Sequence, residues 1–494
     1  MICTHYYTYI GALTSKPYAF KARSWELQSI ETIDLFESIC SNIKIDIKGS
    51  EIARILPLNN KDVNDEWLSD KSRYAYDGLK RWRFIYPMIK KNNSFVQTSW
   101  KNVFQFVQDK INNNKYSNII INTGNFTDLE TITALKTFSD KFDNVILNKG
   151  DKFNSDVQNY YFDINLNTLN SKIIIYIGFN IRIENPVLNI RLKKASANKN
   201  FLLAFIGNKF NNNLNVLHLG NSINVLKKIK QGKHLFNTII KNFLKKNIKN
   251  INIKNYFKQS IDIVMGKDYY NRIKTFTNSL FLTNNSSLKF NYNIIYNSVG
   301  RINLLELNFY NNRTFNNLMP NLYYLIGTEY INEIKSSDFV IFQGHHNDKI
   351  RLNFHVILPV LNWTEKSSLY INCLGQVQRT NIILNSPKLV RLDWKIVRMI
   401  SIFFNADIDY TSIKEIHNRL VELTPNIINS IAKYNIHQKY KIHYKSSTKK
   451  YIFIDNNPFT FQMSNYYLTN SIERSSKIML ECFNILEKKK NNFI

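Results

Sequence analysis

The fold is decided by a stretch that reads FVIFQGHHND at residues 339–348, HVILP at 355–359, TEK at 364–366 and YINCLGQVQRT at 370–380. It contains two short runs of β-branched and aromatic residues, each ending at a residue that interrupts regular structure. Gly344 can adopt turn conformations closed to other residues, and Pro359 has no N–H to donate to a sheet. Such an order is typical of a ligand crevice in an open α/β sheet. Periodicity alone favours a plainer alternative, a sheet edge with an ordinary surface loop.

An apolar run followed by glycine occurs six times along the chain. The runs span residues 119–121, 173–177, 201–206, 261–265, 322–326 and 339–342, and they precede Gly124, Gly178, Gly207, Gly266, Gly327 and Gly344. Because the chain has only 14 glycines, this placement indicates repeated β–turn–α units rather than chance. It predicts an α/β fold with doubly wound parallel sheets.

Two helix starts can be predicted within this pattern. The sequence Thr127-Asp128-Leu129-Glu130 is typical of a capping box, and Leu129, Ile132, Leu135 and Phe138 then form one helical stripe. Pro186 follows the second run at a position typical of the first residue of a helix.

Residues 21–90 predict a small β-rich unit. Isoleucines alternate at positions 43, 45 and 47 and recur at 52 and 55, with Gly49 between them as the turn. The segment at 62–81 is rich in charged residues, and we expect it to form a charged loop that closes the unit.

The chain is strongly basic, with 66 Lys and Arg against 37 Asp and Glu and a formal charge of +29. Such a charge would ordinarily suggest nucleic acid or an anionic membrane as partner. The lysines are scattered, however, and they accompany an excess of Asn, Ile, Tyr and Phe, all encoded by AT-rich codons. An AT-biased genome, as in many organelles, is therefore the preferred explanation, and nucleic-acid binding is the weaker alternative.

No run of 18 apolar residues occurs in the sequence, so we expect contact with a membrane only through partners. The four cysteines, Cys3, Cys40, Cys373 and Cys482, are far apart and predict neither a zinc site nor a disulfide framework. The N-terminus shows neither a basic amphipathic presequence nor a signal peptide.

The order of several segments resembles the molybdopterin-oxidoreductase superfamily, and most closely its non-molybdenum branch, the largest iron–sulfur subunit of respiratory complex I. Residues 124–138 look like the family's Gly-x-x-x-Asp-x-Glu segment. Residues 178–186 look like Gly-Thr-Asn-Pro-Arg-x-Glu-x-Pro, with Phe179 and Ile181 in place of Thr and Pro. Further resemblance lies at residues 11–20, 219–220, 232–236, 393–398 and 467–482. It covers only the part of that subunit after its cluster-binding domains.

The resemblance implies a division of the chain. Residues 1–20 are similar to the junction after the iron–sulfur domain, and residues 21–90 to a small β-rich subdomain that holds a 4Fe–4S cluster in true molybdoenzymes. Residues 91–440 form the α/β molybdopterin-oxidoreductase-like core, and residues 441–494 form a C-terminal extension with a closing helix. In the family the segment at 67–81 packs against the iron–sulfur part, so we expect an interchain contact there.

The resemblance also implies where the cofactors are held. The family places the last cysteine ligand of a 4Fe–4S cluster at the position of Thr8, and a hydroxyl is a poor substitute for a thiolate. Cys3 is nearby but out of register. We therefore expect no cofactor in this chain, with 4Fe–4S and 2Fe–2S clusters on a separate chain that carries the N-terminal half of a split subunit. Molybdenum is not expected, because the few glycines and scattered cysteines offer no ligand set or pterin loops.

Three groups are candidates for chemistry, each with a plainer alternative. His345 and His346 could bind a metal or relay protons, although a hydrogen-bonded loop pair is preferred because no third ligand stands at a recognisable spacing. The segment at 364–366 could supply acid–base groups, or it could be a structural loop or an exposed ion pair. Arg182 and Glu184 follow a predicted strand, where nucleotides bind in such folds, but G-x-G-x-x-G and P-loop motifs are absent. We assign no catalytic, cofactor-binding or metal-binding residue.

The resemblance implies a structural role in the matrix-facing peripheral arm of mitochondrial complex I at the inner membrane, supporting electron transfer from NADH to ubiquinone. The partners would be the cluster-bearing chain, the flavoprotein and other peripheral-arm subunits, with no nucleic acid, and the composition favours mitochondrial encoding. A stand-alone molybdopterin-dependent oxidoreductase is the first alternative, and a basic organellar nucleic-acid-binding protein is the second.

Overall fold

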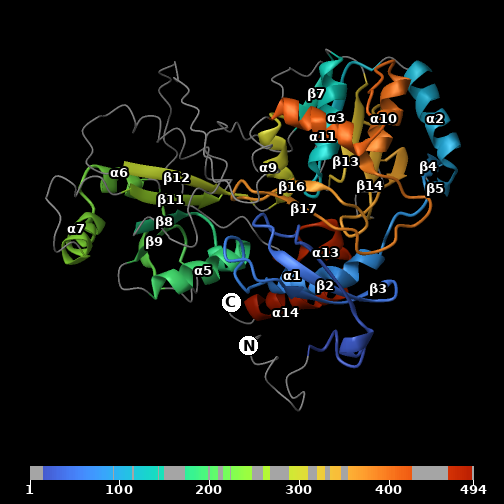
Figure 1. Cartoon of the computed structure of the whole chain (residues 1–494). Coiled ribbons are helices and arrows are strands. Elements are labelled where there is room, and N and C mark those ends of the chain that lie inside the picture. Colours follow the sequence, from blue (N-terminus) through green and yellow to red (C-terminus); the bar gives the residue numbers. More distant parts are fainter. Residues whose placement is uncertain are drawn as a thin grey trace.

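The computed structural model describes residues 15–92, 94–113, 116–142, 144–148, 173–197, 201–209, 215–222, 224–247, 260–266, 289–296, 298–309, 320–328, 334–346, 354–424 and 466–491. Within these ranges the elements form a large mixed sheet with its helices, a smaller parallel sheet with its helices, and a small antiparallel sheet that carries the C-terminal helices (Figure 1).

The large sheet has seven strands in the order β5-β4-β15-β14-β13-β6-β7. Its strands are β4 (Met88–Lys91), β5 (Ser94–Gln97), β6 (Ile119–Thr123), β7 (Val145–Asn148), β13 (Leu322–Ile326), β14 (Phe339–Gly344) and β15 (Val356–Pro359). The five strands from β15 to β7 are parallel, whereas β4 and β5 add an antiparallel edge. The parallel strands are buried on both faces and therefore read as continuous apolar runs.

Helices α2 (Trp100–Asn113), α3 (Leu129–Asp140) and α10 (Asp393–Phe403) lie together beside this sheet, with α11 (Ile413–Leu423) against α3 (Figure 1). The predicted stripe from Leu129 to Phe138 is buried, which confirms it. The predicted capping box is wrong. Asp128 is the N-cap and accepts from the Thr131 N–H at 2.8 Å, while the Glu130 carboxylate accepts from the N–H of Leu369, far away in the sequence.

The second sheet is all parallel, in the order β10-β9-β8-β11-β12. Its strands are β8 (Ile173–Ile177), β9 (Leu202–Ile206), β10 (Leu217–Gly220), β11 (Ser260–Gly266) and β12 (Lys289–Ile295), and the helices around it are α4 (Ile181–Glu184), α5 (Pro186–Ser196), α6 (Asn224–Lys230) and α7 (Leu235–Asn247). Pro186 is the first residue of α5, as predicted. All six predicted apolar runs form strands, three in the seven-stranded sheet and three in the five-stranded sheet. The prediction of an α/β fold is therefore confirmed.

Residues near the N-terminus build the small antiparallel sheet β1 (Gln28–Ile33), β2 (Asn42–Lys48) and β3 (Glu51–Pro57), preceded by the 3-10 helix η2 (Ser24–Glu26). Gly49 forms the β2–β3 turn with a φ of +61°. The predicted charged loop is wrong, because this segment contains α1 (Asp70–Tyr74) and the 3-10 helix η3 (Ala75–Lys80). The side chains of Lys71 and Arg73 are buried there, whereas charged side chains of a solvated loop would be exposed.

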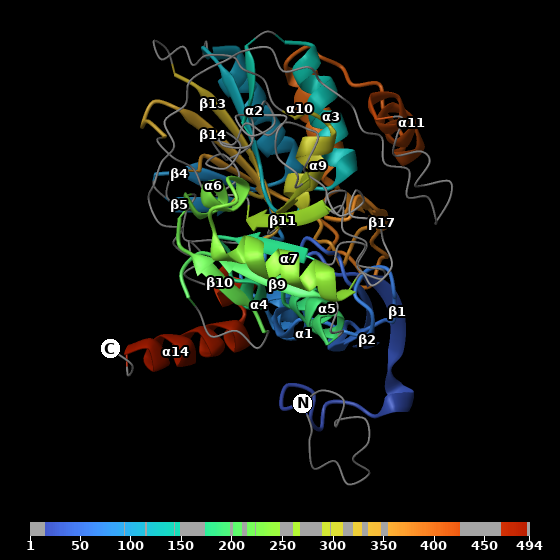
Figure 2. The same ribbon diagram turned by 90° about the vertical axis from the view of Figure 1, so that its left-hand side faces the viewer.

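The C-terminal helices complete the core of this N-terminal unit. They are η7 (Tyr466–Leu468), α13 (Ser471–Ser475) and α14 (Lys477–Asn491), and Asn470 caps α13. Ile472 and Met479 share one apolar cluster with the N-terminal sheet. Figure 2 shows α14 leaving the body beneath the five-stranded sheet. The domain boundaries stay a prediction. The boundary drawn at residue 90 falls within β4, which pairs with β15 of the large sheet.

Candidate functional site

The candidate site lies where the strand order of the seven-stranded sheet reverses. β6 is followed in the chain by α3 and β7 on one side, and β13 pairs with β6 on the other side. Ligands of open α/β sheets bind outside the carboxyl ends of the strands at such a point. The short hairpin β16 (Leu369–Ile371) and β17 (Val377–Arg379) and helix α9 (Val299–Glu306) pack against this edge.

Three glycines allow the backbone segments that meet at this point to contact one another closely. The Gly124 N–H donates to the carbonyl of Ile326 at 2.7 Å, and a Cβ on Gly124 would lie 1.9 Å from the carbonyl oxygen of Gly327. Gly300, at the start of α9, donates to the Asn125 carbonyl at 2.9 Å, and its own Cβ would lie 2.6 Å from the Gly124 oxygen. The backbone therefore fills the space between the ends of β6 and β13.

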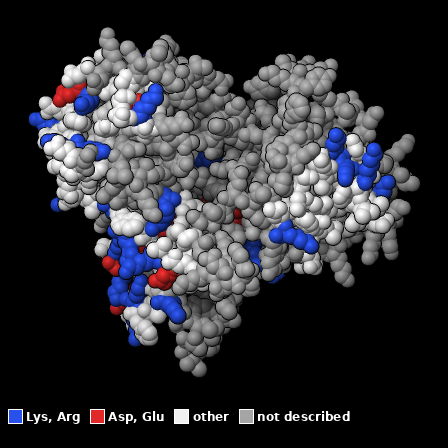
Figure 3. Space-filling model, turned by 180° about the vertical axis from the view of Figure 1, so that it is seen from behind, with Lys and Arg blue, Asp and Glu red and all other residues white. Residues whose placement is uncertain are grey.

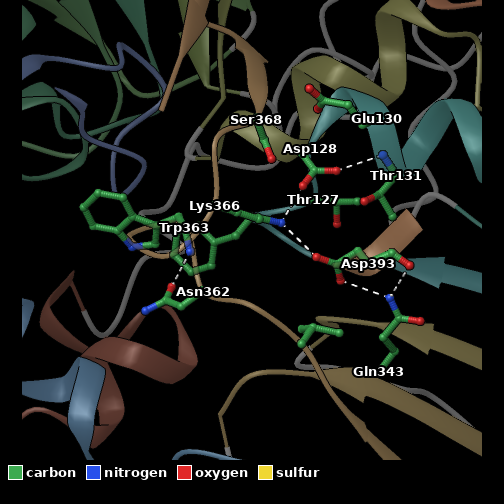
Figure 4. A network of polar contacts seen from close by, with 12 residues as sticks. Thr127, Asp128, Glu130, Thr131, Gln343, Asn362, Trp363, Lys366, Ser368 and Asp393 are labelled. Carbon is green, nitrogen blue, oxygen red and sulfur yellow. Dashed lines mark hydrogen bonds and ion pairs between the residues drawn. The ribbon is translucent and has the colours of Figure 1, made fainter. Parts of the chain in front are cut away.

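Beside these glycines lies a buried polar network centred on Lys366 (Figure 4). Its ammonium group donates to Asp128 and, at 2.8 Å, to the carboxylate of Asp393. Gln343, at the end of β14, donates to Asp393 Oδ1 at 3.0 Å, and the Tyr324 hydroxyl donates to Gln343. The side chains of Lys366, Asp128 and Asp393 are only 5%, 4% and 8% exposed. The network thus joins the ends of β13 and β14, the start of α3, the start of α10 and the loop after β15.

The electrostatics of the network favour a charged lysine. Burial alone would lower the pKa of Lys366, but Asp128 and Asp393 raise it well above its usual value. Burial would likewise raise the pKa of Asp128, yet the ammonium group keeps that pKa lowered, whereas the pKa of Asp393 stays raised by burial. A lysine held protonated in this way cannot serve as a base.

The structure also excludes the exposed ion pair as an explanation of this segment. Glu365 pairs with Arg83 at 2.5 Å, and their side chains are only 10% and 7% exposed. Arg83 also donates to the Val360 carbonyl at 3.1 Å. Three buried ion pairs, one made by Glu365 and two by Lys366, therefore attach the loop after β15 to the core and to the segment before β4.

His345 and His346 contact each other within the same region. Their Nδ1 atoms are 2.6 Å apart, and His346 Nε2 lies 3.0 Å from the Gly78 carbonyl oxygen. A carbonyl only accepts, so His346 Nε2 carries a proton, and in the neutral ring Nδ1 must then accept from the Nδ1–H of His345. The pair thereby links the end of β14 to η3 through one chain of directed hydrogen bonds.

Both histidines are held neutral. Burial, followed by the neighbouring Arg83, lowers the pKa of His346 to about 3, and burial with His346 lowers the pKa of His345 well below its usual value. In the described part of the chain, no group of three or more His, Cys, Asp or Glu side chains is placed to hold a metal ion. The geometry therefore supports a hydrogen-bonded pair.

Acidification is expected to destabilise the fold through these histidines. Below the usual pKa of 6.5, an unfolded chain binds protons that the folded chain refuses, so the free energy of unfolding falls from pH 6.5 toward pH 3. Urea unfolding as a function of pH measures this slope. His346→Gln should flatten it, and an unchanged slope in this variant would contradict the assignment.

A second buried charged cluster fastens α13 to the N-terminal unit. Lys71 pairs with Glu473 at 2.8 Å, and Asp34 accepts from Ser72 at 2.5 Å. Burial raises the pKa of Asp34 to about 6, and burial together with Asp34 raises the pKa of Glu37 to about 8. Glu37 is therefore mostly protonated at neutral pH.

Glu37 predicts the opposite pH dependence. Between its usual pKa of 4.5 and about 8 the folded chain holds a proton that the unfolded chain releases, so stability present below pH 4.5 is lost as pH rises. Glu37→Gln should remove this loss and raise the free energy of unfolding at pH 8.5 by on the order of a few kcal/mol, since one pKa unit corresponds to about 1.4 kcal/mol. Denaturation at pH 5.5 and 8.5 provides the comparison. Equal effects at both values would contradict the assignment.

Arg182 and Glu184 lie away from this site, in α4 at the carboxyl end of β8. Glu184 accepts from the Asn180 N–H at 3.0 Å. Phe179 and Ile181, which replace Thr and Pro of the family pattern, are 1% and 0% exposed and belong to the core. Apolar side chains therefore occupy the start of this turn.

Comparison with known proteins agrees with this architecture. Residues 83–402 match the molybdopterin oxidoreductase family, and residues 27–77 match the NDSU1/NuoG-like 4Fe-4S domain of NADH-ubiquinone oxidoreductase. The NADH-ubiquinone oxidoreductase 75 kDa subunit of Reclinomonas americana is 36% identical over 506 residues, which cover 96% of this chain and 71% of that protein. The chain belongs to the family of the complex I 75 kDa subunit.

Other members of the family match over a similar extent. The mitochondrial 78 kDa subunit of Candida albicans is 32% identical over 96% of this chain and 66% of its own length. The mitochondrial NADH dehydrogenase [ubiquinone] iron-sulfur protein 1 of Solanum tuberosum is 31% identical over 97% of this chain and 64% of its own length. The chain thus spans about two thirds of the length of these relatives.

The residues present do not fit the family's cofactors. An iron–sulfur cluster needs a set of thiolates, usually four, but the segment that matches the 4Fe-4S domain contains Cys40 alone, which is fully buried. Cys373 lies close by, because its N–H donates to the Ser38 carbonyl at 2.7 Å, and burial raises the pKa of both thiols.

Sequence reasoning found most of these residues but not their association. The sequence predicts Asp128 only as part of a capping box, and Lys366 as part of a segment that could supply acid–base groups, form a structural loop or make an exposed ion pair. Arg83, Glu37 and Gly300 were missed. One signal was present: an acidic residue inside an apolar run, as at Glu37, must either be neutral or have a buried partner.

Proposed function

We propose that the chain is the α/β part of this iron–sulfur subunit in the matrix-facing peripheral arm of mitochondrial complex I, where it has a structural rather than a catalytic role. One observation carries the proposal. Family membership extends over 96% of the chain, while the segment that matches the 4Fe-4S domain contains a single cysteine and a buried ion network lies at the described strand ends. A rigid body of this kind can hold neighbouring redox centres at fixed separation.

We further propose that the iron–sulfur clusters lie on a separate polypeptide, the cluster-bearing part of a split subunit. Support comes from the ligand inventory, because the four cysteines of these 494 residues do not provide a cluster site, and Thr8 stands at the position of the family's ligand. The flavoprotein and other peripheral-arm subunits would be further partners, and the AT-rich composition favours mitochondrial encoding.

A native gel of mitochondrial membranes, stained for NADH dehydrogenase activity, tests the proposal. Mass spectrometry of the active band should find this chain together with a distinct cluster-bearing polypeptide, and intact-mass measurement should show the two as separate chains. Migration of the chain away from the active band would refute the complex I role. A single larger polypeptide carrying both parts would refute the split.

The match to the molybdopterin oxidoreductase family supports a second candidate, a stand-alone molybdopterin-dependent oxidoreductase. Stoichiometric molybdenum and extractable pterin in the purified chain would favour it. We expect neither, because the few glycines and scattered cysteines offer no pterin loops and no molybdenum ligand set.

A further inference from the structure

Residues 15–26, which we call the aromatic arm, run along the edge of the N-terminal sheet. The arm is attached to that sheet at several points. Lys48 donates to the carboxylate of Glu26 at 2.7 Å and to the Lys21 carbonyl at 3.4 Å. The Arg54 guanidinium lies 4.7 Å from the centre of the Tyr18 ring, a cation–π contact. The arm therefore has a defined position on the sheet.

Despite this attachment, the two largest apolar side chains of the arm project into solvent. Phe20 is fully exposed and has a φ of +61°, a conformation that bulky residues rarely adopt. Trp25 is 80% exposed, and Trp82, two residues beyond the end of η3, is 60% exposed. Lys80, at the end of η3, pairs with Glu51, the first residue of β3, next to the turn that Lys48 borders. Trp82 lies two residues after Lys80, so it is near the same edge of the sheet. Exposed aromatic residues that an ordered backbone holds outward are typical of binding surfaces.

Basic side chains surround these aromatic residues. Lys16, Lys21, Arg23, Lys48 and Lys80 are all exposed. Figure 3 shows Lys and Arg side chains gathered at the lower left, over the N-terminal sheet, with a few acidic residues among them. Aromatic residues and arginine are enriched at protein interfaces, and a charged rim of this sign selects a partner surface with the opposite sign.

We infer that the aromatic arm is a docking surface for a protein partner, which receives Phe20 and Trp25 in apolar pockets bordered by carboxylates. This inference rests on the proposed function, which identifies the partner as the cluster-bearing polypeptide. Residues 11–20 resemble the junction between the family's iron–sulfur and α/β parts, and so lead into the arm. An anionic membrane and a second copy of the chain are the other occupants that the test below distinguishes.

Hydroxyl-radical footprinting with mass spectrometry tests the inference on the unmodified protein. The oxidation rates of Trp25 and Phe20 are compared between the free full-length chain and the NADH dehydrogenase complex purified from mitochondria. We expect both residues to be oxidised rapidly in the free chain and at least fivefold more slowly in the complex. Leu235 on α7 is also 80% exposed and is the matched control, expected to react alike in both samples.

The outcomes separate the inference from the proposed function. If the chain is absent from the active complex, the proposed function fails and the identity of the partner with it. If the chain is present but Trp25 is oxidised at the rate of the free chain, the docking surface is wrong while the function stands. Protection of Trp25 in the free chain by vesicles containing phosphatidylserine, or by dimerisation of the chain, would assign the arm to a membrane or to a second copy and overturn the inference.

A pair of variants provides an independent test. Trp25→Asp should reduce incorporation of the chain into the complex by at least tenfold, whereas Leu235→Asp should incorporate normally. Both positions are largely exposed, so the thermal unfolding of each free variant should stay close to that of the unmodified chain. Normal incorporation of Trp25→Asp would contradict the inference.

Discussion

Replacement of Lys366 by methionine is expected to destabilise the chain by about 3–5 kcal/mol, because it leaves buried carboxylates without their partner. Asp128 and Asp393 both accept from the Lys366 ammonium group, and both carboxylates are buried in the folded chain. Urea unfolding can follow the loss through tryptophan fluorescence, since Trp363 and Trp394 are 1% and 5% exposed and report on this region. A shift of the midpoint at constant slope would show a change in stability alone.

Two comparisons establish that the buried charge causes the loss. Lys80→Met removes an ion pair whose side chains are 50% and 71% exposed, so its effect should be about 0–1 kcal/mol. The triple variant Lys366→Met, Asp128→Asn, Asp393→Asn should recover much of the stability, because it removes all three charges and asparagine can still cap α3. If Lys366→Met costs no more than Lys80→Met, the network does not hold the elements together.

The strands of this fold could be predicted from the sequence because their signal is local. Residues 173–177 and 322–326 are continuous apolar runs that end at glycine, and they form β8 and β13 with the predicted bounds. Such runs arise when a parallel strand is buried on both faces, so each strand carries its own evidence in its sequence. Which neighbour a strand pairs with is not local, and β11, for example, pairs with β8 although β9 and β10 lie between them in the chain.

The candidate site could be predicted only in part, because its contacts join residues far apart in the sequence. Glu130 follows the capping pattern locally, but its carboxylate binds the Leu369 N–H instead. Similarly, the lysine and arginine of the segment at 67–81 read as solvated charges, although Lys71 meets Glu473 in the C-terminal helix α13. A charged residue and its buried partner leave no periodic pattern, so composition alone cannot distinguish them from surface charges.

Gly124→Ala is expected to destabilise the chain by about 3 kcal/mol or more, at the upper end of the effects of overpacking. The added Cβ would lie 1.9 Å from the Gly327 carbonyl oxygen and 2.9 Å from the Thr328 nitrogen. These atoms belong to the backbone at the end of β13, which pairs with β6 through its whole length and so cannot move away like a flexible side chain. Thermal and urea unfolding of the variant measure the loss.

The control for this substitution is Gly49→Ala in the β2–β3 turn. Gly49 has a φ of +61° and no atom within 4 Å of the added Cβ, so only the backbone conformation opposes alanine, at about 1–2 kcal/mol. A larger loss at Gly124, where φ is ordinary, would therefore measure the close contact between β6 and β13 itself. If Gly124→Ala is as stable as the unmodified chain, the strand ends can separate.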